Sequence, residues 1–159
     1  MTLVLGLDPG TATTGFGLVS EQPGGGLQLV DYGTIQTPAG LSDPERLVIL
    51  HKRMLEIILL HQPQGCAVEK LFFQKNVRTA IAVGQARGVI LLALAESGLE
   101  VGEYTPNEIK LAVSGYGKAD KRQVQEMVRV LLNMDELPKP DDAADALAVA
   151  ITHLHTHHY

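Results

Sequence analysis

The sequence predicts a single α/β domain over residues 1–159, built on one five-stranded mixed sheet with helices on both faces. Three short apolar stretches separated by short turns fill residues 3–36, which is typical of an antiparallel meander. Strand-like and helix-like stretches then alternate, so the later strands arrive through helical crossovers. The length suits one domain, and 45% hydrophobic with 19% charged residues is typical of a soluble globular protein.

The meander is expected to contain three strands. Leucine at every second position predicts a strand over residues 3–8 that ends on Asp8. After a threonine-rich turn, residues 16–20 predict the second strand. The hairpin turn at residues 24–26, which are all glycine, leads into the third strand over residues 27–36.

Prolines and acidic residues then delimit a helix and the next strand. Asp43 is expected to be an N-cap, Pro44 follows in the first turn, and Pro63 stops the helical pattern. Residues 66–69 predict a short strand that, like the first, ends on an acid, here Glu69. A loop is expected to follow this strand.

The remaining chain predicts one more strand and four helices. A long helix ends at the stop signal of Gly98, and a strand follows over residues 101–104. Residues 115–117 break the helical pattern between two shorter helices. The expected helix starts are Asn76, Thr105 with Glu108 completing a capping box, Asp120, and a position near Asp141.

The charge of the chain is unevenly distributed. A formal net charge of −5 argues against a nucleic-acid partner, because such affinity comes largely from Lys and Arg on phosphates. Residues 70–129, however, hold 9 Lys/Arg against 6 Asp/Glu, whereas residues 1–69 hold 3 against 7 and residues 130–159 hold 1 against 5. The asymmetry fits either chance on a solvated surface or a basic platform beside an acidic metal site.

Other features indicate a cytoplasmic protein with no membrane partner. Cys66 is the one cysteine, so no internal disulfide forms, which fits a reducing compartment. The N-terminal stretch lacks a basic region and carries Asp8, so no signal peptide is expected. The longest strongly apolar run, residues 89–95, is too short to cross a bilayer.

Four acids lie where α/β sheets build their sites. Asp8 and Glu69 end two strands, and Asp142 and Asp145 open the last helix on one face at i, i+3. If the first and fourth strands are neighbours and the last helix packs beside them, the four carboxylates converge. Taken singly, each acid is more often a turn residue, a helix cap or a solvated group, and Asp141 is the one most expected to be a plain cap.

Four carboxylates cannot share a pocket without a counter-charge. Hard divalent cations with oxygen ligands supply that charge, and Mg²⁺ is the natural one, with Mn²⁺ as a substitute. Two such ions can hold a phosphodiester, activate a water molecule and stabilise the leaving oxygen. The pattern therefore predicts hydrolytic nuclease chemistry with two Mg²⁺ ions per subunit.

Three segments, in order over nearly the whole chain, resemble the RuvC family of Holliday-junction resolvases. An Asp-Pro-Gly alone would be weak support for that resemblance, but the three segments together at these distances are highly specific. The segments are Leu7-Asp8-Pro9-Gly10-Thr11 with Thr14-Gly15-Phe16-Gly17, residues 68–76 with Gly84-Gln85-Ala86-Arg87-Gly88, and residues 142–148 with Ile151-Thr152-His153.

The resemblance implies an RNase H-like fold and a homodimeric, Mg²⁺-dependent endonuclease of recombination and DNA repair. Such an enzyme makes paired symmetric nicks across four-way junction DNA and works with the RuvA–RuvB branch-migration complex. A two-fold dimer suits a nearly two-fold substrate. By the same resemblance, the metal-binding catalytic acids are Asp8, Glu69, Asp142 and Asp145.

The resemblance also implies groups that contact the DNA. Lys110 and Lys121 match family lysines near the scissile phosphate, where positive charge stabilises the transition state. Phe72 matches an aromatic that contacts bases near the junction, and Phe73 is expected to be core, although the choice between the two stays open. The other expected DNA contacts are Lys75, Arg78, Lys118 and Arg122.

Four histidines, His153, His155, His157 and His158, crowd the C-terminal stretch. His153 and His157, at i, i+4, would suit a transition metal if the last helix continued, but a frayed, solvated tail is the stronger expectation. His153 is also a candidate neighbour of the carboxylate-bound metals.

Three other functions fit part of the pattern. Residues 8–15 nearly match the phosphate loop of the actin, Hsp70 and sugar-kinase ATP-binding superfamily, but those proteins need two such domains. The related RuvX-like proteins of RNA processing are disfavoured by the Phe72-Phe73 segment and by the paired helical aspartates. A non-catalytic junction-binding module would be indicated by the loss of one acid, and none is missing.

Overall fold

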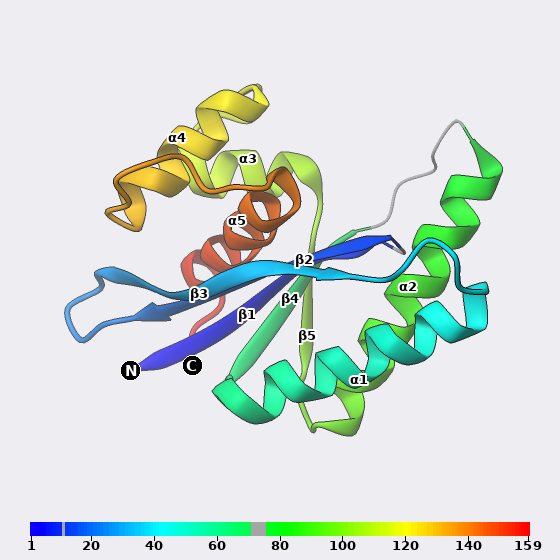
Figure 1. The fold of residues 1–159 in the computed structure, drawn as a ribbon. Helices are drawn as coiled ribbons and strands as arrows, with labels where there is room; N and C mark the ends of the chain where they lie inside the picture. Colours follow the sequence, from blue (N-terminus) through cyan, green and yellow to red (C-terminus); the bar gives the residue numbers. More distant parts are fainter. Residues whose placement is uncertain (11, 71–75) are drawn as a thin grey trace.

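The computed structural model describes residues 1–10, 12–70 and 76–159. Its strands are β1 (Thr2–Asp8), β2 (Thr13–Glu21), β3 (Leu27–Gln36), β4 (Gly65–Glu69) and β5 (Val101–Tyr104). They form one sheet in the order β3-β2-β1-β4-β5 (Figure 1). The β1–β2 and β2–β3 pairs are antiparallel, whereas β1–β4 and β4–β5 are parallel. The sheet is therefore mixed, as predicted, and β1 and β4 are neighbours, which is the condition for the acids to converge.

Helices cover both faces of this sheet, which confirms the predicted architecture (Figure 1). One face carries α1 and α2, and the other carries α3, α4 and α5. The order of strands and helices along the chain also agrees with the sequence. The helices are α1 (Asp43–His61), α2 (Val77–Glu96), α3 (Pro106–Ser114), α4 (Lys121–Leu131) and α5 (Asp141–Thr156).

Alternation along β1 divides the apolar core into two layers. Leu5 and Leu7 pack with residues of α1 and α2, whereas Val4 packs with residues of α3, α4 and α5. All three side chains are fully buried. Successive side chains of a strand point to opposite faces, so a strand covered on both sides needs apolar residues at odd and even positions alike.

The packing of α5 against β1 and β2 is unusually close. A Cβ atom added to Gly6 would overlap the backbone oxygen of Ala146, and one added to Gly15 would overlap the backbone oxygen of Asp142. The facing residues of α5 are largely alanines, and most of this helix is buried. Glycines on the strands and alanines on the helix therefore let the two backbones approach each other.

Two predicted element starts are wrong by a few residues. The N-cap of α1 is Ser42 instead of Asp43, because the serine hydroxyl accepts from the Glu45 N–H while the Glu45 carboxylate accepts from the Ser42 N–H. This capping box satisfies two backbone donors, and Asp43 falls in the first helical turn. β2 begins at Thr13 instead of Phe16, because the threonines expected in a turn already pair with β3.

The helix α2 exposes much apolar surface. By length and composition alone it is long and apolar enough to cross a membrane, although most of its residues are not buried inside the protein. The apolar stretch of this helix is therefore longer than residues 89–95, the longest apolar run expected from the sequence. Val77, Ile81 and Leu92 are each more than half exposed. An exposed apolar face of this kind is typical of an interaction surface.

Substituting Gly6 by Ala should destabilise the protein, because the new methyl group would push α5 away from β1. Overpacking of this kind typically costs roughly 1–3 kcal/mol in the free energy of unfolding. The matched control is Gly40→Ala, at a position where an added Cβ would contact nothing. Urea unfolding of both variants tests the prediction, and equal stability of the two would contradict the close packing of α5.

Candidate active site

Three elements bring the predicted acids to one end of the sheet. Asp8 and Glu69 end the parallel neighbours β1 and β4, whose last paired residues are Leu7 and Val68. Asp142 and Asp145 lie in the first turns of α5, which packs across β1 and β2. The site therefore depends on two strand ends and one helix start, as the sequence predicted.

Three of the four acids form a tight cluster. One carboxylate oxygen from each of Asp8, Asp142 and Asp145 lies within 4.8 Å of the other two. Glu69 lies beside this cluster instead of within it. It lines an adjacent cavity of about 250 Å³ together with Asp145, Lys110 and other residues of α3, α4 and α5.

The cluster is electrostatically strained without a cation. Burial, followed by the charges of Asp145, Asp142 and Glu69, raises the pKa of Asp8 to about 8. Burial and other acids also raise the pKa of Asp145 and of Glu69. Half-buried carboxylates that face one another resist ionisation, and an all-oxygen donor set suits a hard divalent cation such as Mg²⁺ or Mn²⁺. The residues present therefore fit a divalent metal ion.

Both predicted lysines lie at this site. Lys110 of α3 and Lys121 at the start of α4 line the cavity with Glu69, and their charges lower the pKa of that acid against the effect of burial. The Lys121 ammonium lies 3.8 Å from an Asp145 carboxylate oxygen. Positive charge therefore borders the carboxylates on the α3 and α4 side.

Asp141 is not the helix cap that the sequence suggested. Pro140 occupies the N-cap position of α5, with no side-chain hydrogen bond to the helix. Asp141 instead accepts from Lys121 at 3.2 Å and from Gln125 at 3.1 Å. Lys121 and Asp141 are both more than half exposed, so this pair adds little stability. Its effect is to hold the lysine between two acids of α5.

Arg87 of α2 is a site residue whose part the sequence did not reveal. Its guanidinium donates to the backbone oxygen of Glu69 at 2.7 Å and pairs with the carboxylate of Glu103 on β5. Only 13% of the arginine side chain is exposed. The arginine therefore fixes the end of β4 from the opposite face of the sheet. Arg87 lies in the second of the three segments that resemble the RuvC family, but its spacing in the sequence did not predict a contact with Glu69.

His153 lies away from the carboxylates, contrary to the expectation. It is buried in α5, and its two ring nitrogens lie 2.7 Å from the Tyr104 hydroxyl and 2.6 Å from the Tyr159 hydroxyl. It sits near Gly65, where β4 begins, whereas Glu69 ends that strand. The solvated tail expected here is also wrong for His153, and both nitrogens are already engaged, which leaves none for a metal.

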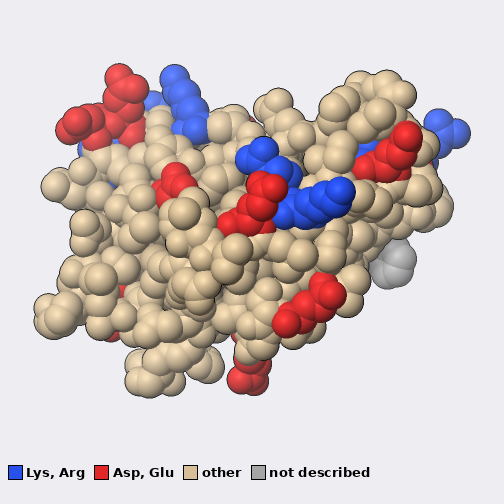
Figure 2. Space-filling view, turned by 60° about the horizontal axis from the view of Figure 1, so that its bottom comes forward, with Lys and Arg blue, Asp and Glu red and all other residues tan. Residues whose placement is uncertain are grey.

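Of the six predicted DNA-contact residues, three lie within the described residues and three do not. Phe72, Phe73 and Lys75 lie outside the described residues. The other three, Arg78, Lys118 and Arg122, are exposed at helix starts or in the turn before α4. On the face shown in Figure 2, acidic and basic side chains are interspersed, so this face is not the basic platform that the charge distribution could have formed.

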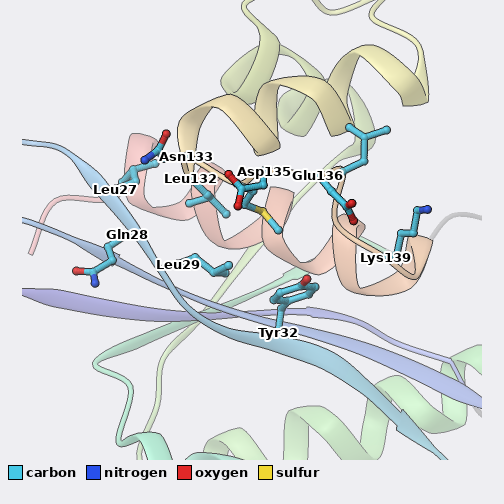
Figure 3. A pocket seen from close by; sticks show the side chains of 11 residues that line it. Leu27, Gln28, Leu29, Tyr32, Leu132, Asn133, Asp135, Glu136 and Lys139 are labelled. Carbon is cyan, nitrogen blue, oxygen red and sulfur yellow. The ribbon is translucent and has the colours of Figure 1, made fainter.

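A larger cavity, of about 790 Å³, lies elsewhere and contains none of the predicted catalytic acids. Its walls are β3 and the connection between α4 and α5, and Leu29 and Tyr32 point into it from the strand (Figure 3). Asp135, Glu136 and Lys139 line its other side. Without a cluster of convergent acids, this cavity offers no comparable metal site.

Comparison with known proteins identifies one family. Residues 4–153 match the family model for crossover junction endodeoxyribonuclease RuvC. The protein of that name from Chloroflexus aggregans is 60% identical over 152 residues, which cover 96% of this chain and 92% of the relative. The one from Desulfitobacterium hafniense is 56% identical over 154 residues, covering 97% and 93%.

Solved structures show the same likeness. T. thermophilus RuvC in complex with a Holliday junction substrate matches with a TM-score of 0.91 at 37% identity, covering 96% of this chain and 93% of that chain. The yeast mitochondrial Holliday junction resolvase Ydc2 reaches a TM-score of 0.70 at 11% identity, which is a likeness of fold alone. The predicted RNase H-like fold is confirmed by these matches.

The acid cluster should make metal-free protein less stable as the pH rises. With a pKa of about 8 in the folded state and 3.8 as the ordinary value, folded Asp8 keeps a proton that the unfolded chain loses between these two pH values. Stability is therefore lost from about pH 4 to pH 8. Asp8→Asn removes this loss, and should raise Tm in EDTA at pH 8 by at least about 2 °C, with little change at pH 4.

Thermal unfolding at both pH values, in EDTA and in Mg²⁺, measures this effect. Asp135→Asn is the matched control, since this exposed acid lines the other cavity. Mg²⁺ should raise the Tm of the unaltered protein more than that of Asp8→Asn. An Asp8→Asn variant that is less stable than the unaltered protein in EDTA at pH 8 would show that the cluster is not strained.

Proposed function

The chain belongs to the RuvC family of crossover junction endodeoxyribonucleases, and on that premise we propose that it resolves Holliday junctions by paired symmetric nicks in recombination and DNA repair. It is a hydrolase of phosphodiester bonds. The observation that supports the proposal most directly is the cluster of Asp8, Asp142 and Asp145, with carboxylate oxygens within 4.8 Å of one another. Glu69, beside the cluster, completes the four acids that the family motifs supply.

The proposed site binds two Mg²⁺ ions, for which Mn²⁺ can substitute. Asp8, Asp142 and Asp145 hold them, together with Glu69. When bound, such ions supply an activated water molecule and neutralise charge on the phosphate. The chain itself holds the acids in place through β1, β4 and α5, and no side chain needs to act as a nucleophile.

Lys110 and Lys121 act on the scissile phosphate in this proposal. Both line the cavity that Glu69 and Asp145 share, so a phosphate placed beside the acids meets their ammonium groups. Positive charge held in advance at that position stabilises the negative charge that gathers in the transition state. Asp141 keeps Lys121 at the edge of the cluster.

The proposed DNA contacts lie around this site. Phe72, by resemblance, stacks on an unpaired base near the junction, and Phe73 either packs in the core or shares that role. Exposed Arg78, Lys118 and Arg122 suit backbone phosphates, as does Lys75 by its place in the motif. These cations come from the basic segment of residues 70–129.

The proposed assembly is a homodimer that uses the exposed apolar face of α2. Val77, Ile81 and Leu92 are more than half exposed there. A second copy of the chain would cover this face and present an equivalent site to the opposite strand of the junction. The proposed setting is the cytoplasm, with the RuvA–RuvB complex as the partner on the same DNA.

The alternative functions are not supported. The family match spans residues 4–153, and the relatives that share its name cover nearly the whole chain. Neither an ATP-binding domain of the actin and Hsp70 superfamily nor a RuvX-like protein of RNA processing accounts for that match. All four acids are present, so nothing favours a non-catalytic junction-binding module.

Removing one acid should abolish cleavage and spare binding. Asp8→Asn or Glu69→Gln should slow the cutting of a synthetic mobile four-way junction by at least about a hundredfold, because metal-ligand loss costs more than the 10- to 100-fold typical of outer-shell changes. Junction affinity should stay within about threefold, since most of it comes from phosphate contacts.

The assay compares the four-way junction with linear duplex, in Mg²⁺ and in EDTA, with Asp135→Asn as the matched control. Paired symmetric nicks in the junction alone, and only with Mg²⁺, are expected of the unaltered protein. Wild-type cutting by either altered protein would show that the metal site is assigned to the wrong residues. Equal cutting of duplex and junction would contradict the resolvase function.

Phe72→Ala should impair cutting more than it impairs folding. Loss of base stacking is worth about 1–3 kcal/mol per base, which lowers the cutting rate by roughly 5- to 140-fold. Urea unfolding measures stability beside the cleavage rate. A variant that unfolds in the absence of denaturant would show that Phe72 belongs to the core.

A further inference from the structure

The turn between α3 and α4 presents an aromatic side chain to solvent. Tyr116 is 55% exposed, directly after Gly115, which ends α3 with a positive φ of 76°. Glycine adopts this left-handed conformation readily, so the chain reverses there and places Tyr116 at the outside of the turn. No part of the function proposed above uses this tyrosine.

The backbone of Tyr116 is held firmly although its ring is exposed. Its N–H donates to the Ser114 hydroxyl at 3.2 Å, and that hydroxyl donates to the Lys110 carbonyl oxygen at 2.5 Å. The N–H of Ala119 donates to the Tyr116 carbonyl oxygen at 3.1 Å. Because the backbone is already fixed, only the two side-chain torsions of the tyrosine lose freedom when a ligand stacks on its ring.

Tyr116 lines a cavity of about 330 Å³ between the turn and α4. This volume is at the lower end of the range of small-molecule sites, which is about 300–1,000 Å³. Tyr116, Ala119 and Met127 form apolar walls. The other lining residues are Ser114, Arg122, Gln123 and Glu126.

The charged and polar groups around the cavity favour a negatively charged ligand such as a DNA strand. The Glu126 carboxylate accepts from Arg129 at 3.1 Å, so its charge is already offset. Gln123 accepts from the Asp120 N–H through its side-chain oxygen, which leaves its amide donors for another acceptor. Lys118 and Arg122 are exposed, and neither forms a salt bridge within the described ranges.

The start of α4 lies between this cavity and the acidic site, with Arg122, Gln123 and Glu126 on one side of the helix and Lys121 and Val124 on the other. Arg122 lines the cavity and directly follows Lys121, whose ammonium lies 3.8 Å from Asp145. Lys110, on the other helix of the pair, lines the acidic cavity too. A DNA strand with one phosphate at the carboxylates therefore reaches this cavity by crossing the start of α4.

We propose that Tyr116 and this cavity form a binding subsite for one unpaired nucleobase of the strand held at the carboxylates. The base stacks on the tyrosine ring, its edge meets the Gln123 amide, and its flanking phosphates meet Lys118 and Arg122. The subsite rests on the proposed function, because a four-way junction supplies unstacked bases at its centre. It is separate from the base contact assigned to Phe72.

The test measures binding of a four-way junction in EDTA, where no cutting is expected, with 2-aminopurine placed in turn at each position near the centre. Tyr116→Ala should weaken binding by roughly 5- to 140-fold, which corresponds to ~1–3 kcal/mol of lost stacking at ~1.4 kcal/mol per factor of ten. Tyr116→Phe and Tyr116→Trp should retain binding, since they keep a ring. At one position, 2-aminopurine should be brighter with Tyr116→Ala than with the unaltered protein.

The matched control is Val130→Ala, at an apolar position of α4 that is also 55% exposed but lies outside the cavity. Arg122→Ala should lower the salt dependence of binding by about one unit of slope, whereas Tyr116→Ala should not, because only the first removes a phosphate contact. Urea unfolding checks that the Tyr116 variants stay folded.

Equal affinity of Tyr116→Ala and the unaltered protein, with no position of altered fluorescence, would overturn the subsite and leave the proposed function standing. Equal losses in Tyr116→Ala and Tyr116→Phe would also overturn it, because the hydroxyl would then be the contact instead of the ring. Failure of the unaltered protein to bind the junction would instead contradict the proposed function, and the subsite with it.

Discussion

The close approach of α5 to β1 and β2 determines where the three clustered acids of the site lie. Gly6 and Gly15 remove the side chains that would hold the helix away from the sheet, and alanines fill the helix side of the contact. Asp142 and Asp145 are thereby held against Asp8. A looser packing would separate these acids, so the geometry of the metal site is inseparable from the packing of the core.

That packing brings together carboxylates that repel one another. The raised pKa of Asp8 means that ionisation of this acid in the folded chain lowers the stability of the protein. Lys121 and Lys110 offset part of the repulsion from one side only. Repulsion between carboxylates therefore remains at one end of the sheet, and a divalent cation bound there would relieve it.

Local signals made most of the fold predictable. The alternation of β1, the capping box at Thr105 and the cap at Asn76 depend on neighbouring residues, and the structure has each of them where the sequence placed it. The cap of α1 was misplaced by one residue, because Ser42 and Asp43 are both good caps and only the bond to Glu45 decides between them.

Contacts between distant segments were not predictable in the same way. The convergence of the acids was conditional on the pairing of β1 with β4, which the structure has, but the position of Glu69 beside the cluster was not foreseen. The partner of Asp141, on α4, and the contacts of His153 with two tyrosines depend on packing that no periodicity encodes.

Arg87 makes a contact of this kind between two faces of the sheet. It joins α2, the helix proposed for the dimer, to the backbone of Glu69 on β4. A movement of α2 is therefore transmitted to the strand end that carries Glu69, so the geometry of this acid depends on a helix on the opposite face of the sheet.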